Sequence, residues 1–102
     1  MAVNTPVALF RGNATTSTGT TLYTVPASTT AIITSIVIAN NSASAQTATI
    51  AFDSIPIVTA VALAANTTQV IDMKQVLTTT KLITGGASAT SVSFHISGVE
   101  SV

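Results

Sequence analysis

The chain has 102 residues, of which only three are basic and three are acidic, while 47% are hydrophobic. Its zero net charge excludes the basic surface that binds nucleic acid or an anionic membrane. The lack of cysteine excludes disulfides, thiolate metal sites and a thiol nucleophile. Because a typical soluble domain is about a quarter charged, this composition favours a protein whose faces pack against other proteins.

Val, Ile and Thr are abundant, and these β-branched residues favour strands. We predict seven or eight short strands, at 7–10, 20–25, 30–40, 47–52, 57–63, 68–73, 81–84 and 91–97. Turn-forming residues separate them at 11–13, 40–42, 65–66 and 85–86. Residues 73–77 are the only candidate for a helical turn. This pattern predicts an all-β fold, an antiparallel β-sandwich that is jelly-roll-like or immunoglobulin-like.

The segment 30–40 is the strongest of the predicted strands. It carries apolar residues on both faces, with Ile32, Ile36 and Ile38 on one face and Ile33 and Val37 on the other. A strand that is apolar on both faces is expected to be covered on both sides. The covering element is either a second sheet or a neighbouring subunit.

The whole chain, 1–102, is expected to form a single domain. Residues 1–6 are expected to form a flexible N-terminal arm, and the Thr-, Ser- and Gly-rich segment 15–21 a flexible loop. No apolar stretch reaches the roughly 20 residues that span a membrane, and no signal peptide is expected. We therefore expect synthesis in a cytosol and no membrane partner.

Catalysis requires titratable groups gathered in one place, and this sequence has few. His95 is expected on the outward, serine-lined face of the strand 91–97, whose inward residues are Val92, Phe94 and Ile96. One histidine without nearby acids or cysteines cannot complete a metal site, so we interpret it as a surface or interface residue. No nucleophile-elbow motif supports a Ser–His–Asp triad. We predict no enzyme activity, no catalytic, metal-binding or cofactor-binding residues, and no cofactor.

Asp72 and Lys74 are two residues apart and therefore share one face of a predicted strand. Two interpretations stay open: a salt bridge between subunits, or a solvated pair worth at most about 1 kcal/mol. Gly85 and Gly86 lack the lysine and the spacing of a phosphate-binding loop, so a turn is the expected structure there.

Several strand and turn segments occur in a distinctive order. They are TLYTVP at 21–26, AIITSIVIAN at 31–40, LAANT at 63–67, VIDMKQVL at 70–77 and VSFHISGVE at 92–100. This order resembles that of small β-sandwich structural proteins of tailed bacteriophage virions. The resemblance covers most of residues 20–100, and it rests on strand-and-turn patterns rather than on an invariant signature.

The resemblance implies a capsid decoration (cement) protein that forms a homotrimer on the virion surface and bridges subunits of the major capsid protein. The arm at 1–6 and the loop at 15–21 are then the expected capsid contacts, and the chain is made in the host cytoplasm. The alternative is a tail or head-fibre module that contributes to host attachment, with Tyr23 as the one exposed aromatic residue for a glycan. The family has no catalytic residues to transfer to this chain.

Overall fold

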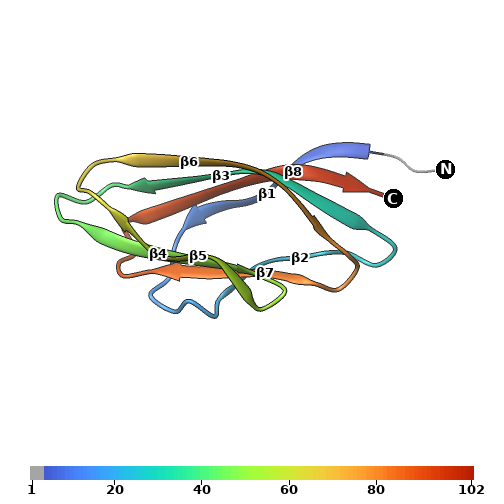
Figure 1. The fold of residues 1–102 in the computed structure, drawn as a ribbon, viewed down its shortest axis with the longest axis horizontal. Helices are drawn as coiled ribbons and strands as arrows, with labels where there is room; N and C mark the ends of the chain where they lie inside the picture. The colour runs from blue at the N-terminus through green and yellow to red at the C-terminus, as the bar shows by residue number, and fades with distance from the viewer. Residues whose placement is uncertain (1–3) are drawn as a thin grey trace.

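The computed structural model describes residues 4–102, which form eight antiparallel strands in two four-stranded sheets (Figure 1). Sheet A has the strand order β1-β8-β3-β6 and sheet B the order β2-β7-β4-β5. The predicted all-β antiparallel sandwich is confirmed. The strands are β1 (Asn4–Asn13), β2 (Thr21–Thr24), β3 (Thr30–Asn40), β4 (Gln46–Phe52), β5 (Ile55–Leu63), β6 (Thr68–Leu77), β7 (Leu82–Ala87) and β8 (Val92–Ser101).

The connectivity is that of a jelly roll. Strands pair antiparallel as β1 with β8, β2 with β7, β3 with β6, and β4 with β5. These nested pairs describe one long hairpin of four strand pairs that is wrapped into two sheets, as in eight-stranded jelly rolls. The innermost turn is Asp53–Ser54, where both residues have positive φ, 53° and 64°. Positive φ at both central residues is typical of a type I′ turn, whose twist matches that of the flanking strands.

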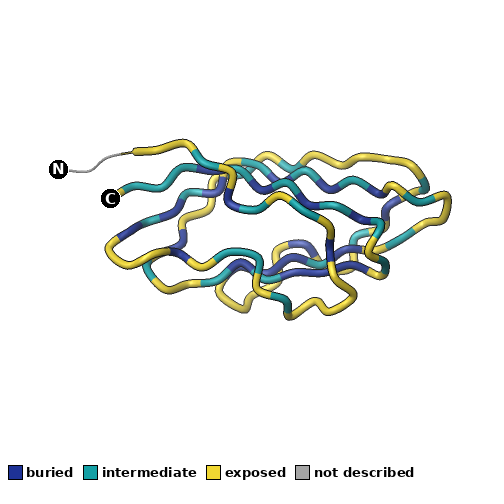
Figure 2. The backbone as a smooth tube through the Cα atoms, turned by 180° about the vertical axis from the view of Figure 1, so that it is seen from behind, coloured by how far each residue is buried: buried dark blue, intermediate teal, exposed yellow. Residues whose placement is uncertain are grey.

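The core lies between the two sheets, where inward-facing residues of both layers meet (Figure 2). Val92, Phe94 and Ile96 of β8 are fully buried, which confirms the alternation predicted for this strand. Ile50 of β4 and Ile83 of β7 oppose them from sheet B and are also fully buried. The apolar residues predicted from period-2 alternation therefore form one continuous core.

A bulge in β3 changes which isoleucines enter this core. Ile33 pairs with Gly98 of β8, whereas Ser35 pairs with Ser97, so Thr34 is an extra residue in the ladder. An extra residue reverses the alternation beyond it. Ile33 is therefore buried together with the isoleucines at 36 and 38, while Ile32 lies half-buried on the outer face. The predicted grouping of faces was wrong for Ile32 and Ile33 because it assumed an uninterrupted strand.

The Gly85–Gly86 pair lies inside β7 and is buried, so the predicted turn was wrong. The segment before β2 runs beside β7, where the Gly85 amide donates to the Thr20 carbonyl and the Ala87 amide to the Thr15 carbonyl, both at 2.9 Å. A Cβ at Gly86 would overlap the carbonyl oxygen of Ser17. Glycine is required here because two backbones approach closely. The segment 15–21, expected as a flexible loop, is hydrogen-bonded to sheet B instead.

Two further expectations concern the ends of strands. Residues 73–77 continue β6 as a strand to Leu77, so the predicted helical turn was wrong. Of the arm expected at 1–6, residues 1–3 lie outside the described residues, and Asn4, Thr5 and Pro6 pair with β8 as part of β1. No helix within residues 4–102 is long and apolar enough to cross a membrane.

Candidate functional site

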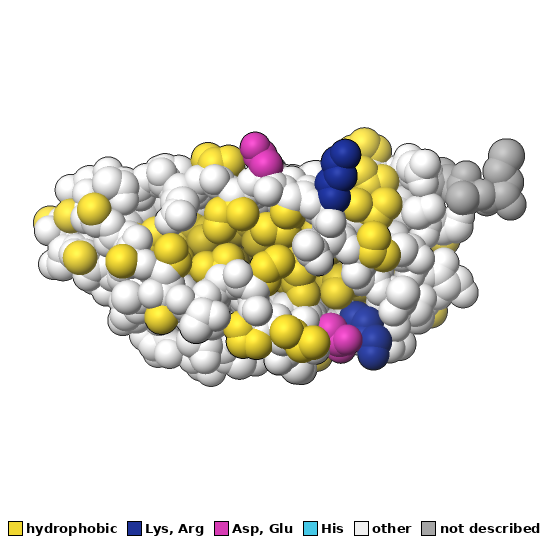
Figure 3. Space-filling model, viewed as in Figure 1, with side chains coloured by type: hydrophobic (Ala, Val, Ile, Leu, Met, Phe, Trp, Pro, Cys, Tyr) yellow, Lys and Arg dark blue, Asp and Glu magenta, His cyan; other side chains and the backbone are white. Residues whose placement is uncertain are grey.

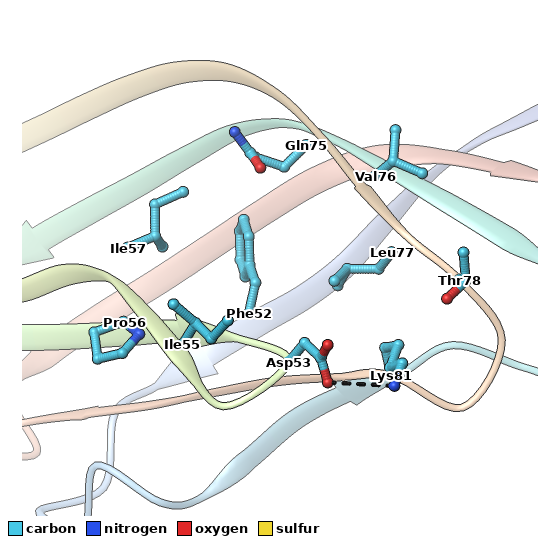
Figure 4. A pocket seen from close by; sticks show the side chains of 10 residues that line it. All are labelled: Phe52, Asp53, Ile55, Pro56, Ile57, Gln75, Val76, Leu77, Thr78 and Lys81. Atoms are coloured by element: carbon cyan, nitrogen blue, oxygen red, sulfur yellow. Dashed lines mark ion pairs between the residues drawn. The ribbon is translucent and has the colours of Figure 1, made fainter.

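The sandwich is open along the side where β5 and β6 form the edges of their sheets. Each of these strands pairs on one flank only, β5 with β4 and β6 with β3. A groove of about 340 Å³ lies between them. In Figure 4, Phe52, Ile57 and Leu77 extend toward the space between the two strands. The full lining is Phe52, Asp53, Ile55, Pro56, Ile57, Gln75, Val76, Leu77, Thr78 and Lys81.

The local sequence of β5 explains why its side of the groove is apolar yet exposed. Pro56 has no amide hydrogen for a ladder, which confines it to an edge strand. A register shift between Ile50 and Ala51 of β4 leaves Ile57 without a partner. Ile55 is 69% exposed and Ile57 is 39% exposed. The start of β5 therefore presents isoleucines that neither sheet covers.

The hydrophobic surface on this side is continuous. Figure 3 shows a strip of hydrophobic side chains between β6 and β5, with charged groups only at its margins. At the Asp53 end of the groove, the Lys81 ammonium lies 3.6 Å from the Asp53 carboxylate (Figure 4), and both side chains are about half exposed. An exposed pair of this kind contributes little to stability, so apolar contact dominates the chemistry of the opening. Exposed apolar surface rimmed by polar groups is typical of an interaction site.

Sequence reasoning did not predict this opening. The available signal was Pro56 beside two isoleucines, which indicates an edge strand with an uncovered apolar face. The opening also requires that β5 and β6 are edge strands of different sheets, and this follows only from the topology.

Asp72 and Lys74 lie on the exposed outer face of β6, together with Val70 and Val76. Within residues 4–102 the one ion pair is Lys81–Asp53, so Asp72 and Lys74 do not bridge each other in the single chain. A salt bridge between subunits therefore remains the alternative that would use both charges.

The opposite side of the sandwich, at β1 and β2, is closed. The hydroxyl of Tyr23 on β2 donates a hydrogen bond to the Glu100 carboxylate on β8, which joins the two sheets. Burial, with the adjacent Glu100 carboxylate, raises the pKa of Tyr23 above its ordinary value of 10.0. Tyr23 is half-buried and its hydroxyl is engaged, so it is not the exposed aromatic platform that the sequence suggested.

His95 lies on the outer face of sheet A, half-buried, with Arg11 of β1 and Val37 of β3 as its register partners. This position agrees with the predicted outward orientation. In the described part of the chain, no group of three or more His, Asp or Glu residues is placed to hold a metal ion.

The comparisons with known proteins concern the fold. No protein-family model matches the chain, and no curated protein is similar to it in sequence. A chain of the T13 particle of IBDV, an icosahedral virus, is similar in structure, with a TM-score of 0.57 and 10% identity. The similarity covers 98% of this chain and 30% of that one, so this chain spans under a third of the neighbour's length. The two share a fold.

Two further solved structures are more distant. The coat protein of Tobacco streak virus has a TM-score of 0.46 and 12% identity, over 98% of this chain and 83% of that chain. PorU from Porphyromonas gingivalis has a TM-score of 0.39 and 12% identity, over 98% of this chain and 10% of that chain. Neither is close enough to support an argument.

Proposed function

We propose that the chain is a non-enzymatic structural protein of a virion. The observation that carries this proposal is the apolar opening between β5 and β6, on a chain with only six charged residues. Interfaces that persist in an assembly are poor in charge at their centres and rich in apolar contact. The jelly-roll fold, shared with a chain of an icosahedral virus particle, supports the same role.

Within that class, we favour a capsid decoration (cement) protein of a tailed bacteriophage, located on the capsid surface. Such a protein forms a small closed oligomer, a homotrimer, and bridges neighbouring subunits of the major capsid protein. Because it binds the assembled shell and not its separated subunits, it stabilises the shell by mass action. The resemblance of residues 20–100 to small phage virion proteins and the apolar opening support this choice.

The test compares the heat resistance of emptied shells with and without the purified chain. We expect the shells to bind the protein and to disassemble at a higher temperature. Ile55→Lys, which places a charge in the opening, should weaken binding, whereas Ala45→Lys, in the exposed turn between β3 and β4, is the matched control and should bind normally. Equal heat resistance of bare and coated shells would contradict a cement role.

The alternative is a tail or head-fibre module that contributes to host attachment. It has less support, since the one aromatic residue expected to bind a glycan, Tyr23, is half-buried and hydrogen-bonded to Glu100. Virions that lack the protein distinguish the two roles: a fibre module predicts reduced adsorption to cells, and a cement protein predicts normal adsorption with fragile shells.

A further inference from the structure

The outer edge of β6 is an unpaired strand edge with a self-complementary sequence. β6 pairs with β3 on one flank and has no neighbour on the other. Its exposed outer-face residues are, in order, Val70, Asp72, Lys74 and Val76. Counted outward from Met73, each direction meets first a charged residue and then a valine. The charged residue is Lys74 in one direction and Asp72 in the other. Charged side chains on an edge strand usually discourage pairing with another chain, but here each charge has a matched opposite charge on a second copy of the same strand.

We infer that β6 is the contact with a second copy of this chain, through an antiparallel β6–β6 pairing whose twofold axis passes beside Met73. In this register, Asp72 of each copy lies opposite Lys74 of the other, and Val70 lies opposite Val76. Opposite charges on side chains that face each other across an antiparallel pair attract. A twofold contact uses the same patch on both copies, so each favourable pair occurs twice.

Charge scarcity strengthens the inference. The chain has six charged residues. Lys81 and Asp53 pair within the chain, and Glu100 accepts the Tyr23 hydroxyl. Asp72 and Lys74 have neither kind of partner among the described residues. The proposed register gives each of them an opposite charge, while the valines at 70 and 76, both about 60% exposed, gain apolar contact.

The shape of the edge agrees with a contact made mainly by side chains. Thr34 of β3 faces two residues of β6, Met73 and Lys74, so β6 is bulged at the proposed axis. Asp72 and Val76 nevertheless stay on one face, because their partners on β3, Ser35 and Ile32, both lie on its outer face. A bulge interrupts the regular ladder. Backbone pairing is therefore confined to the two ends of the contact, and the charged pairs hold its centre. Because β6 borders the open side, the pairing also brings the openings of the two copies together (Figure 3).

This contact is independent of the proposed function, because a virion protein and any other protein could use it. It also differs from the homotrimer proposed above, since a threefold ring must be built from a different surface. The measurement is molar mass as a function of protein concentration, by light scattering or sedimentation. We expect the unmodified chain to associate in multiples of two times the 10.2 kDa chain mass.

Charge reversals test the register. D72K sets a lysine against Lys74 of the other copy, and K74D sets an aspartate against Asp72 of the other copy. Each variant alone should therefore raise the dissociation constant about tenfold or more. The double variant D72K/K74D restores opposite charges at both pairs and should associate as the unmodified chain does. R11D, on the outer face of β1, changes net charge as much as K74D does and should not weaken association.

Mixing the variants provides the decisive experiment. D72K and K74D together form two opposite-charge pairs and should associate with each other more tightly than either variant associates alone. R11D has the same net charge as K74D but keeps Lys74, so it sets one pair of facing lysines against D72K. Fluorescently labelled D72K should therefore bind R11D more weakly than it binds K74D. Tighter binding of labelled D72K to K74D than to R11D supports the inference. A monomeric unmodified chain, a mass that no β6 charge reversal alters, or equal binding of labelled D72K to K74D and R11D would overturn it.

Discussion

The two long sides of the sandwich differ in how the sheets are joined. On the side of β1 and β2, the Tyr23–Glu100 hydrogen bond connects the sheets, and the segment before β2 is hydrogen-bonded to β7. On the side of β5 and β6, no hydrogen bond joins the two strands among residues 4–102, and isoleucines line the gap. The first side stabilises the single chain, whereas the second has surface left for a partner.

The largest expected effect comes from disrupting the closed side at Gly86. Gly86→Ala puts a methyl group against the Ser17 carbonyl oxygen and forces two backbones apart, which should lower the free energy of unfolding by about 3 kcal/mol. Gly19→Ala is the control, because the nearest atom to its added Cβ is the Ser17 hydroxyl oxygen at 4.0 Å. Urea unfolding measures both. Equal stabilities would contradict the close contact at β7.

A pair of identical substitutions on the two sides comes next. Val25, beside β2, is 1% exposed, and Val25→Ala should cost about 2 kcal/mol through lost burial and a residual cavity. Val76, at the rim of the opening, is 61% exposed, and Val76→Ala should change stability by no more than about 0.5 kcal/mol. Thermal or urea unfolding of the two variants compares the sides directly, and a Val76 effect as large as that of Val25 would show that the opening is packed.

The third effect concerns the hydrogen bond between the sheets. Tyr23→Phe should cost about 1 kcal/mol, because the Glu100 carboxylate loses its donor. The pKa of Tyr23 is raised in the folded chain, so the folded state holds this proton more tightly than the unfolded one. Its contribution is fully present below the ordinary pKa of 10.0 and is lost as pH rises above it.

Urea unfolding at pH 8 and above pH 10 tests this sign. The unmodified chain should lose more stability than Tyr23→Phe over that interval, because only the unmodified chain has the Tyr23 hydroxyl, whereas every other ionisable group is common to both. If the two chains lose the same amount, the Tyr23 hydroxyl is not bonded to Glu100 in solution.

The smallest expected effect is at the ion pair beside the opening. Lys81→Met keeps much of the aliphatic side chain but removes the charge 3.6 Å from Asp53, and both partners are about half exposed. We expect a change of at most about 0.5 kcal/mol, decreasing further in high salt. A loss above about 1 kcal/mol would mean that this end of the groove is more enclosed than its exposure indicates.

The sequence predicted the strands well because alternation depends on neighbouring residues alone. The inward residues Val92, Phe94 and Ile96 followed from alternation in one uninterrupted strand. The prediction of which side chains share a face in 30–40 was wrong from Thr34 on. The bulge there depends on the register in which β8 and β6 pair with this strand. Gly85 and Gly86 had the composition of a turn, and only the approach of another segment reveals why a strand needs them.

The candidate site was less predictable for the same reason. Asp72 and Lys74 were recognisable as a pair on one strand face, but their position on an unpaired edge depends on the topology. Predicting the opening required the topology, because β5 and β6 are edge strands of different sheets on the same side of the sandwich. The prediction for Tyr23 failed in the opposite way. This side chain was expected to be exposed for a ligand, but its hydroxyl donates a hydrogen bond to Glu100, 77 positions away.

The nested pairing of strands has a consequence for the order of folding. Only β4 and β5, joined by the two-residue turn at Asp53–Ser54, can pair as soon as they are synthesised. Each outer pair closes a longer loop, and β1 finds its partner β8 only after β8 has been synthesised. Such non-local pairing is slow relative to local pairing. Strand β1 therefore remains unpaired for longer than any other strand, and its edge is exposed to other chains during synthesis.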